Sequence, residues 1–247
     1  MSEPMLAVAM LSKRYRIFFE KPSLIRSVLP ALMGAGTSRE FWALRDISFT
    51  AAPGECLGII GSNGSGKSTL LKIIAGVTTP TAGRVNVRGA ISSLLELGAG
   101  FHPELTGREN VFLNASILGL TRAEIERRFD AIVEFSGLHE FINTKLYTYS
   151  SGMCLRLGFA VAIHVPFDLL LIDEIIAVGD PAFQEKCSAH VRQLRSRGKT
   201  IVIISHMMGA ITSLCDRVLW LDHGRIAASG PAIDMTRQFV AASAGGE

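Results

Sequence analysis

The sequence lacks several features that would assign it to a specialised class of protein. Its four cysteines are widely spaced with no Cys-x-x-Cys pair, which disfavours a zinc site or redox couple and predicts buried thiols. No run of eighteen apolar residues occurs, because His164, Pro166 and Asp168 interrupt the most apolar region, so we expect no membrane-spanning helix. The first residues lack the basic-then-apolar order of a secretory leader, so a cytosolic location is expected.

Aromatic residues and net charge are also scarce. Phe, Trp and Tyr make up 7% of the 247 residues, and the net charge of +3 is too small by itself to indicate nucleic-acid binding. Hydrophobic residues make up 48% and glycine occurs 24 times, which is typical of a globular α/β protein and disfavours disorder. Basic residues gather between positions 13 and 26; we interpret them as a solvated face, with an anionic membrane surface as the alternative.

Short apolar or β-branched runs, bounded by turn residues, predict the strands of a sheet. The predicted strands are 6–10, 47–52, 56–60, 84–87, 169–172, 200–204 and 217–221. A helix that ends at Gly198 separates the strands at 169–172 and 200–204. This βαβ order predicts a largely parallel sheet.

Residues 16–41 are predicted to form an insertion between the first two strands. Apolar residues recur there at every fourth position, which predicts a short amphipathic helix, and Pro30 is expected to end or kink it. Packing of this helix on the core and exposure to a membrane or partner are both compatible with the pattern.

Residues 105–165 are predicted to form an inserted helical subdomain. Gly119 and Gly137 are expected helix ends, and a further helix is expected to begin near Gly152 and end before Pro166. Two capping boxes mark expected helix starts, Thr106 with Glu109 and Thr121 with Glu124.

The strongest motif follows the predicted strand at 56–60 and precedes a helical run. It fits GxxxxGK[ST], in which glycines let backbone N–H groups face phosphate oxygens and the helix start adds positive potential. Lys67 is expected to reach the β- and γ-phosphates, and the Ser68 hydroxyl to ligate Mg²⁺. A glycine-rich turn without a ligand is the alternative. The predicted phosphate-binding residues are Gly61, Ser62, Asn63, Gly64, Ser65, Gly66, Lys67, Ser68 and Thr69.

Polar residues follow two other predicted strands. Asp173 ends an apolar strand and is the predicted Mg²⁺ partner, while Glu174, the next residue, is the candidate general base for attack of water on the γ-phosphate. His206 follows the strand at 200–204, so parallel pairing would bring it to the same edge as a γ-phosphate donor. No NKxD motif occurs, which disfavours GTP as the nucleotide.

With these motifs the sequence resembles the ATP-binding-cassette (ABC) ATPase family. Its signature here reads Tyr149-Ser150-Ser151-Gly152-Met153, which departs from LSGGQ yet keeps hydroxyls and a glycine at an expected helix start. A plain N-cap at Ser150 is the alternative. The resemblance implies a homodimer with two ATPs sandwiched between cassettes, in which Ser150, Ser151 and Gly152 contact the opposite copy's nucleotide and Asp180 lies at the dimer contact.

The resemblance also implies a fold and two further ligand contacts. The fold is an α/β P-loop NTPase of the ABC ATPase type, with a mostly parallel core sheet, an N-terminal antiparallel β subdomain and the inserted α-helical subdomain. Glu96 occupies the place of the family's metal-sensing glutamine. Adenine is expected to stack on Tyr15, with Phe41 and Trp42 as alternatives.

A narrower resemblance is to the ATPases of O-antigen, capsule and teichoic acid exporters. It is carried by residues 94–110, 149–153 and 177–187, and the resemblance as a whole covers residues 5–235. It implies an ATP-hydrolysing subunit at the cytoplasmic face of the bacterial inner membrane, docked on a separate polytopic membrane subunit in two copies. Its cargo would be a lipid-linked polysaccharide, O-antigen favoured, without a C-terminal carbohydrate-binding domain and without nucleic acid. A soluble cassette ATPase acting on DNA or ribosomes and a small-molecule kinase are the alternatives.

Overall fold

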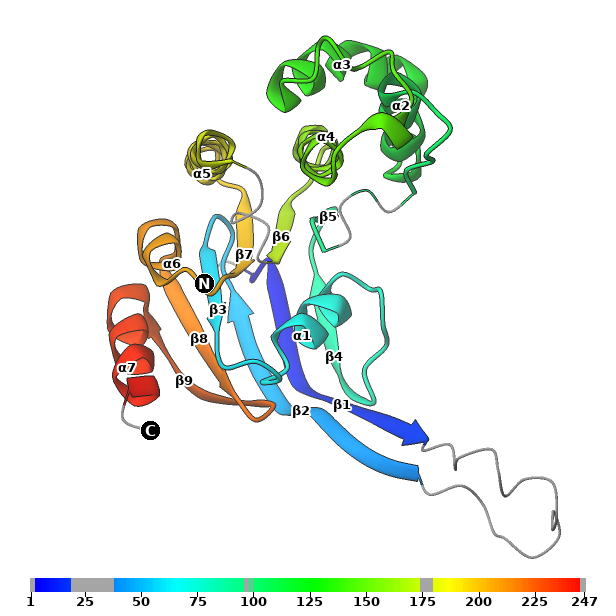
Figure 1. The fold of residues 1–247 in the computed structure, drawn as a ribbon. Coiled ribbons are helices and arrows are strands. Elements are labelled where there is room, and N and C mark those ends of the chain that lie inside the picture. Colours follow the sequence, from blue (N-terminus) through cyan, green and yellow to red (C-terminus); the bar gives the residue numbers. More distant parts are fainter. Residues whose placement is uncertain (1–2, 19–37, 96–97, 99, 174–179, 245–247) are drawn as a thin grey trace, which may run out of the picture.

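The computed structural model describes residues 3–18, 38–95, 98, 100–173 and 180–244 (Figure 1). Two sheets form the body of the protein. An antiparallel sheet has the order β2-β1-β4, and a six-stranded sheet has the order β5-β6-β7-β3-β8-β9. The strands are β1 (Leu6–Phe18), β2 (Ser38–Ala51), β3 (Cys56–Ile60), β4 (Ala82–Val87), β5 (Ile91–Ser93), β6 (Leu169–Asp173), β7 (Thr200–Ile204), β8 (Arg217–Asp222) and β9 (Arg225–Pro231).

The first five strands of the six-stranded sheet are parallel, and β9 pairs with β8 in the antiparallel direction. The helices are α1 (Lys67–Ile74), α2 (Gly107–Ile117), α3 (Arg122–Ser136), η2 (Leu146–Thr148), α4 (Ser151–His164), α5 (Pro181–Ser196), α6 (Met208–Leu214) and α7 (Ala232–Ala244). The mostly parallel core sheet and the N-terminal antiparallel sheet confirm the expected fold class.

The core sheet buries both of its faces. On β3, Leu57 and Ile59 point into one apolar cluster with α1 and the antiparallel sheet, whereas Cys56 and Ile60 point into a second cluster with α2–α7. Alternate residues of a strand face opposite sides of a sheet, so a strand buried on both faces must be apolar throughout. This explains the continuous runs that predict β3, β6 and β7.

The helices that follow β5 form a separate layer. Figure 1 shows α2, α3 and α4, in green, above the core sheet and away from α1. At the start of α2 the N–H of Thr106 donates to the Glu109 carboxylate at 2.8 Å, and the Glu109 N–H donates to Thr106 Oγ1 at 3.2 Å, as the expected capping box requires. Gly137 ends α3 with a φ of 66°, as expected of a glycine in the left-handed region.

The first two strands are much longer than the sequence pattern predicts. β1 and β2 pair as a hairpin whose far end projects from the body (Figure 1), and this end includes residues 16–18 and 38–41 of the predicted insertion. The residues expected to form the amphipathic helix lie outside the described part of the chain. Register shifts on β1, with Met10 at a φ of 50°, break the alternation that would have identified one continuous strand.

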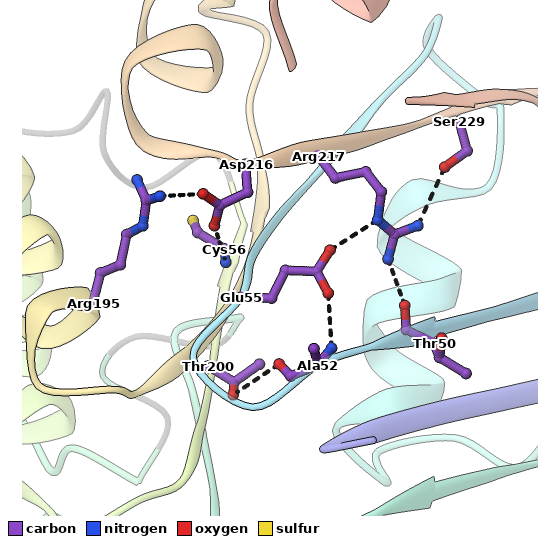
Figure 2. Close-up of polar contacts among 9 residues, drawn as sticks. All are labelled: Thr50, Ala52, Glu55, Cys56, Arg195, Thr200, Asp216, Arg217 and Ser229. Atoms are coloured by element: carbon purple, nitrogen blue, oxygen red, sulfur yellow. Dashed lines mark hydrogen bonds and ion pairs between the residues drawn. The ribbon is translucent and has the colours of Figure 1, made fainter. Parts of the chain in front are cut away.

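A polar network joins the two sheets at the amino-terminal ends of the parallel strands (Figure 2). The Arg217 side chain donates to the Glu55 carboxylate at 2.8 Å, to the Thr50 carbonyl and to Ser229 Oγ. Glu55 in turn accepts the Ala52 N–H at 2.7 Å. One arginine therefore ties β2, β8 and β9 to the turn that leads into β3.

Within the described residues, no helix is both long and apolar enough to cross a lipid bilayer. Of the four cysteines, three are buried and Cys154 is partly exposed.

Candidate functional site

Strand register brings the predicted site residues to one edge of the core sheet. Ile204 of β7 pairs with Ile59 on one side and with Asp173 on the other, so β3, β7 and β6 end at the same level. Gly61 directly follows β3, and His206 lies two residues after β7. The carboxyl edge of a parallel sheet is where open α/β folds bind ligands.

The loop between β3 and α1 is closely packed against neighbouring backbone. A Cβ at Gly61 would lie 2.2 Å from the Leu221 carbonyl oxygen, and one at Gly66 would lie 2.5 Å from the Ala43 carbonyl oxygen. Gly66 also has a φ of 104°, which side chains rarely adopt. These two glycines are therefore required by the loop's own geometry.

The loop presents a buried cation and a buried hydroxyl. Lys67 is 6% exposed, and its Nζ donates to the Gly61 carbonyl at 2.8 Å and to the Ser62 carbonyl at 3.0 Å. Ser65 is 2% exposed, and its Oγ makes no hydrogen bond within the described part of the chain. An unsatisfied buried hydroxyl beside a buried ammonium fits an anionic ligand such as a phosphate.

The remaining residues of the motif are accessible to a ligand. Thr69 is half-buried, while four others are exposed: Ser62, Asn63, Gly64 and Ser68. The first turn of α1 holds no acidic residue, so the positive end of the helix is not neutralised by a side chain of that turn.

Of the four predicted groups Glu96, Asp173, Glu174 and His206, the structure describes two. Asp173 is half-buried at the end of β6, and His206 is exposed after β7. Ser205 is buried and its Oγ accepts the Met207 N–H at 3.1 Å, which turns the chain tightly at His206. Glu174, the candidate base, and Glu96, the candidate metal ligand, lie outside the described residues.

The signature segment begins α4. Ser150 is the N-cap, and its Oγ accepts the Met153 N–H at 3.2 Å. Ser151 is exposed, and a Cβ at Gly152 would meet only Ser150 Oγ, at 3.8 Å, so the helix start is open. In Figure 1 α4 lies in the upper layer and the β3–α1 loop lies below it, so the structure does not bring the signature to this chain's own loop.

Arg156, which the sequence analysis did not single out, contacts Asp180, one of the predicted dimer-contact residues. It lies on α4 and contacts the end of α3 and the start of α5: its Nε donates to the Ser136 carbonyl at 3.0 Å, its Nη1 lies 3.6 Å from Asp180 Oδ2, and its guanidinium stands over the Phe183 ring. Asp180 caps α5 by accepting the Phe183 N–H, which lowers the pKa of the carboxyl. The signal available in the sequence was an arginine inside an otherwise apolar helix, which needs polar partners.

The aromatic candidates for adenine stacking lie on the hairpin. Tyr15 is 38% exposed on β1, with Lys13 over its ring, and pairs across the strands with Phe41. Trp42 lies on the opposite face, where the guanidinium groups of Arg14 and Arg45 each stand over its ring. Within the described residues, Tyr15 and Trp42 therefore both have a cation against the ring.

Several known proteins have sequences similar to that of this chain. The chain is 44% identical to the O-antigen export system ATP-binding protein RfbB of Klebsiella pneumoniae, over 97% of this chain and all of the relative. It is 40% identical to the teichoic acids export ATP-binding protein TagH of Listeria innocua, over 95% of this chain and 69% of the relative.

Solved structures show the same fold. The dimeric ATP-binding cassette MJ0796 bound to ADP and Pi has a TM-score of 0.74 at 23% identity, with 92% of this chain and 99% of that chain covered. An ATP-binding subunit of an ABC transporter has a TM-score of 0.75 at 25% identity, with 96% and 93% covered. Residues 44–177, from β2 to beyond Asp173, match the family model described as ABC transporter. The chain therefore belongs to the ABC transporter family.

Proposed function

We propose that this chain is the ATP-hydrolysing subunit of an exporter that moves a lipid-linked polysaccharide across the bacterial inner membrane. O-antigen is the favoured cargo, because RfbB relatives from two organisms match at 44–51% identity, above the teichoic acid relatives at 40–43%. Capsule and teichoic acid export are the alternatives within the same reaction class.

The observation that carries the ATPase proposal is the burial of Lys67 and Ser65 within the glycine-rich motif, on the edge where Asp173 ends its strand. In the proposed reaction, backbone N–H groups of residues 61–68 and the Lys67 ammonium hold the triphosphate. Glu174 accepts a proton from the attacking water, and His206 donates a hydrogen bond to the γ-phosphate.

The residues around the loop also suit Mg²⁺. The Ser68 hydroxyl and the Asp173 carboxylate are oxygen donors, and Mg²⁺ is commonly held by one or two carboxylates together with phosphate oxygens and water. When bound there, Mg²⁺ would neutralise charge on the β- and γ-phosphates. Glu96 is proposed as a further contact from the segment after β5.

Hydrolysis is proposed to require two copies of the chain. The support is the separation of α4, which carries the signature at its start, from the β3–α1 loop of the same chain (Figure 1), together with the open helix start at Gly152. A second copy would supply its signature to each nucleotide, with Asp180 near the contact and Tyr15 stacked on adenine. ATP-driven closure of this homodimer and its reopening after hydrolysis would be the power stroke.

Transport requires a partner that spans the membrane, and we propose a separate polytopic subunit in two copies. The cassette would sit peripherally at the cytoplasmic face and would not contact the glycan directly. Affinity purification from membranes of the source bacterium should recover one polytopic protein with the cassette. Recovery of the cassette with nucleic acid or ribosomes instead would contradict the transport role.

The ATPase activity is tested by a pair of lysine substitutions in α1. Lys67→Met should reduce phosphate release by at least about 100-fold, because the buried ammonium beside the phosphates is lost. Lys72→Met changes an exposed lysine of the same helix and should leave the rate nearly unchanged. Equal rates for the two variants would contradict the assignment of this loop as the catalytic site.

A further inference from the structure

Tyr149, the first residue of the signature, is held through both its side chain and its backbone. Its side chain is buried, at 9% exposure, and its hydroxyl donates to the Phe141 carbonyl at 2.7 Å. Its backbone N–H donates to the Leu146 carbonyl at 2.9 Å. Burial raises the pKa of Tyr149, so the phenol stays a protonated donor. Both ends of the residue are therefore fixed directly before Ser150.

The phenol passes over the first residue of α2, where only glycine leaves room. A Cβ at Gly107 would lie 2.1 Å from the Tyr149 hydroxyl oxygen and 3.1 Å from the ring carbon that carries it. The Gly107 N–H donates to the Thr144 carbonyl at 3.1 Å, so the start of α2 cannot move away freely. The contact between Gly107 and Tyr149 therefore joins the start of α2 to the residue just before the N-cap of α4.

Backbone hydrogen bonds extend this connection toward the segment that follows β5. The Leu146 N–H donates to the Leu105 carbonyl at 2.8 Å, and the Tyr147 N–H donates to the Pro103 carbonyl at 3.0 Å. Buried Asn110 holds the same segment, because its amide donates to the His102, Leu105 and Thr106 carbonyls. The signature start is therefore tied to residues 102–107 rather than only to its own helix.

We infer that Tyr149 is a positioning residue that sets where Ser150 and Gly152 stand when they meet the nucleotide of a second copy. The leucine usual at this position could fill the space but could not donate a hydrogen bond to Phe141. The pairing with Gly107 makes the position of the signature depend on the start of α2. This inference rests on the proposed function, since it assumes that the signature acts in a two-copy ATP site.

The test measures ATP-driven dimer formation in a Glu174→Gln background, where hydrolysis should be blocked. Tyr149→Phe removes only the hydroxyl and should raise the ATP concentration for half-maximal dimerisation about five-fold, the effect of one lost hydrogen bond. ATP binding to the monomer, measured at protein concentrations too low for dimerisation, should not change. Tyr147→Phe makes the same chemical change at a tyrosine that is 62% exposed and should leave both quantities unchanged.

A second pair of variants tests the contact itself. Gly107→Ala should impair dimerisation more than Tyr149→Phe, because its Cβ would displace the phenol. Adding Tyr149→Phe to Gly107→Ala should recover part of the loss, since removing the hydroxyl makes room for the Cβ. If the effects of the two substitutions on dimerisation simply add, the contact between Gly107 and Tyr149 does not contribute to dimerisation, which would contradict the inference.

The outcomes separate the inference from the proposed function. A Glu174→Gln protein that dimerises with ATP, together with a Tyr149→Phe variant that dimerises at the same ATP concentration, would overturn the inference alone. Equal weakening of monomer binding and of dimerisation would overturn it too, because the effect would then not be specific to the signature. A Glu174→Gln protein that never dimerises would overturn the proposed function and the inference with it.

Discussion

Arg156 Nη1 lies 3.6 Å from Asp180 Oδ2, which joins α4, the helix that begins at the signature, to the N-cap residue of α5. The same guanidinium donates to the Ser136 carbonyl and packs over Phe183, and its side chain is 28% exposed. One residue therefore connects α3, α4 and α5, and a displacement of α4 would be transmitted to Asp180.

Arg156→Ala should destabilise the fold by about 1–3 kcal/mol, because it removes a partly buried hydrogen bond and apolar packing by the side-chain stem. The same substitution should reduce the ATPase rate and leave the binding of ATP to the monomer unchanged. Urea unfolding and phosphate release measure the two effects. The control is Arg192→Ala, which breaks an exposed ion pair with Glu185 on α5 and should cost less than about 1 kcal/mol. Matching losses in the two variants would show that Arg156 has no special structural role.

Two glycines of the loop should respond differently to the same substitution. Gly61→Ala places a Cβ 2.2 Å from the Leu221 carbonyl oxygen and should distort the loop and abolish ATP binding. At Gly64 a Cβ would meet nothing within 4 Å. Gly64→Ala should therefore lower the stability of the fold only by the strain of an alanine at a φ of 79°, about 1–2 kcal/mol. Equilibrium binding of ATP distinguishes the variants, and tight binding by Gly61→Ala would contradict the described loop geometry.

Stability should fall at mildly acidic pH because of His190. Burial, followed by the nearby His164 and Arg197, lowers the pKa of His190 to about 4. The unfolded chain binds this proton near pH 6.5 and the folded chain does not, so the contribution is full above that pH and is lost as the pH falls towards 4. Discounted for partial exposure, the loss should be about 1–2 kcal/mol.

Urea midpoints of the wild type and His190→Leu at pH 7.5 and pH 5 measure this loss. The variant should lose less stability on acidification than the wild type. Some dependence should remain in the variant, since burial also lowers the pKa of His164. An identical acid loss in both proteins would exclude His190 as its source.

The network in Figure 2 should matter for stability and not for nucleotide binding. Glu55→Ala leaves the Arg217 guanidinium, 32% exposed, without its carboxylate and should cost about 1–3 kcal/mol. ATP affinity should not change, because the network lies at the amino-terminal ends of the strands and the loop at their carboxyl ends. Glu40→Ala, which breaks the exposed pair with Arg14, is the matched control and should cost less than about 1 kcal/mol. A large loss of ATP affinity in Glu55→Ala would show that the network also affects nucleotide binding, contrary to this prediction.

The parts of the fold that sequence analysis predicted are those fixed by local pattern. The apolar runs that become β3 and β7 were located with the bounds that the structure gives, because both faces of those strands are buried. The short β5 and the alternating, half-exposed β9 were not recognised, since backbone pairing with β6 and β8 defines them rather than composition. The same reason hid the length of the β1–β2 hairpin.

The candidate site also has a part that local pattern predicts and a part that it does not. The glycine-rich loop could be predicted because its glycines, Lys67 and Ser68 are contiguous in the sequence. The contacts of Arg156 with Asp180 and of Gly107 with Tyr149 join residues far apart in the chain, so no local pattern could indicate them. The hairpin faces that Tyr15 and Trp42 occupy likewise follow from strand register, which no local pattern gives.

The central claim is that one copy's Lys67 and the other copy's Gly152 hold the same γ-phosphate. The most direct measurement is an experimental structure of the Glu174→Gln protein with ATP and Mg²⁺. The account predicts a dimer with two nucleotides, each lying between the loop of one chain and the Gly152 N–H of the other. A triphosphate bound at Lys67 with Gly152 of both copies out of contact, in every assembly observed, would contradict it.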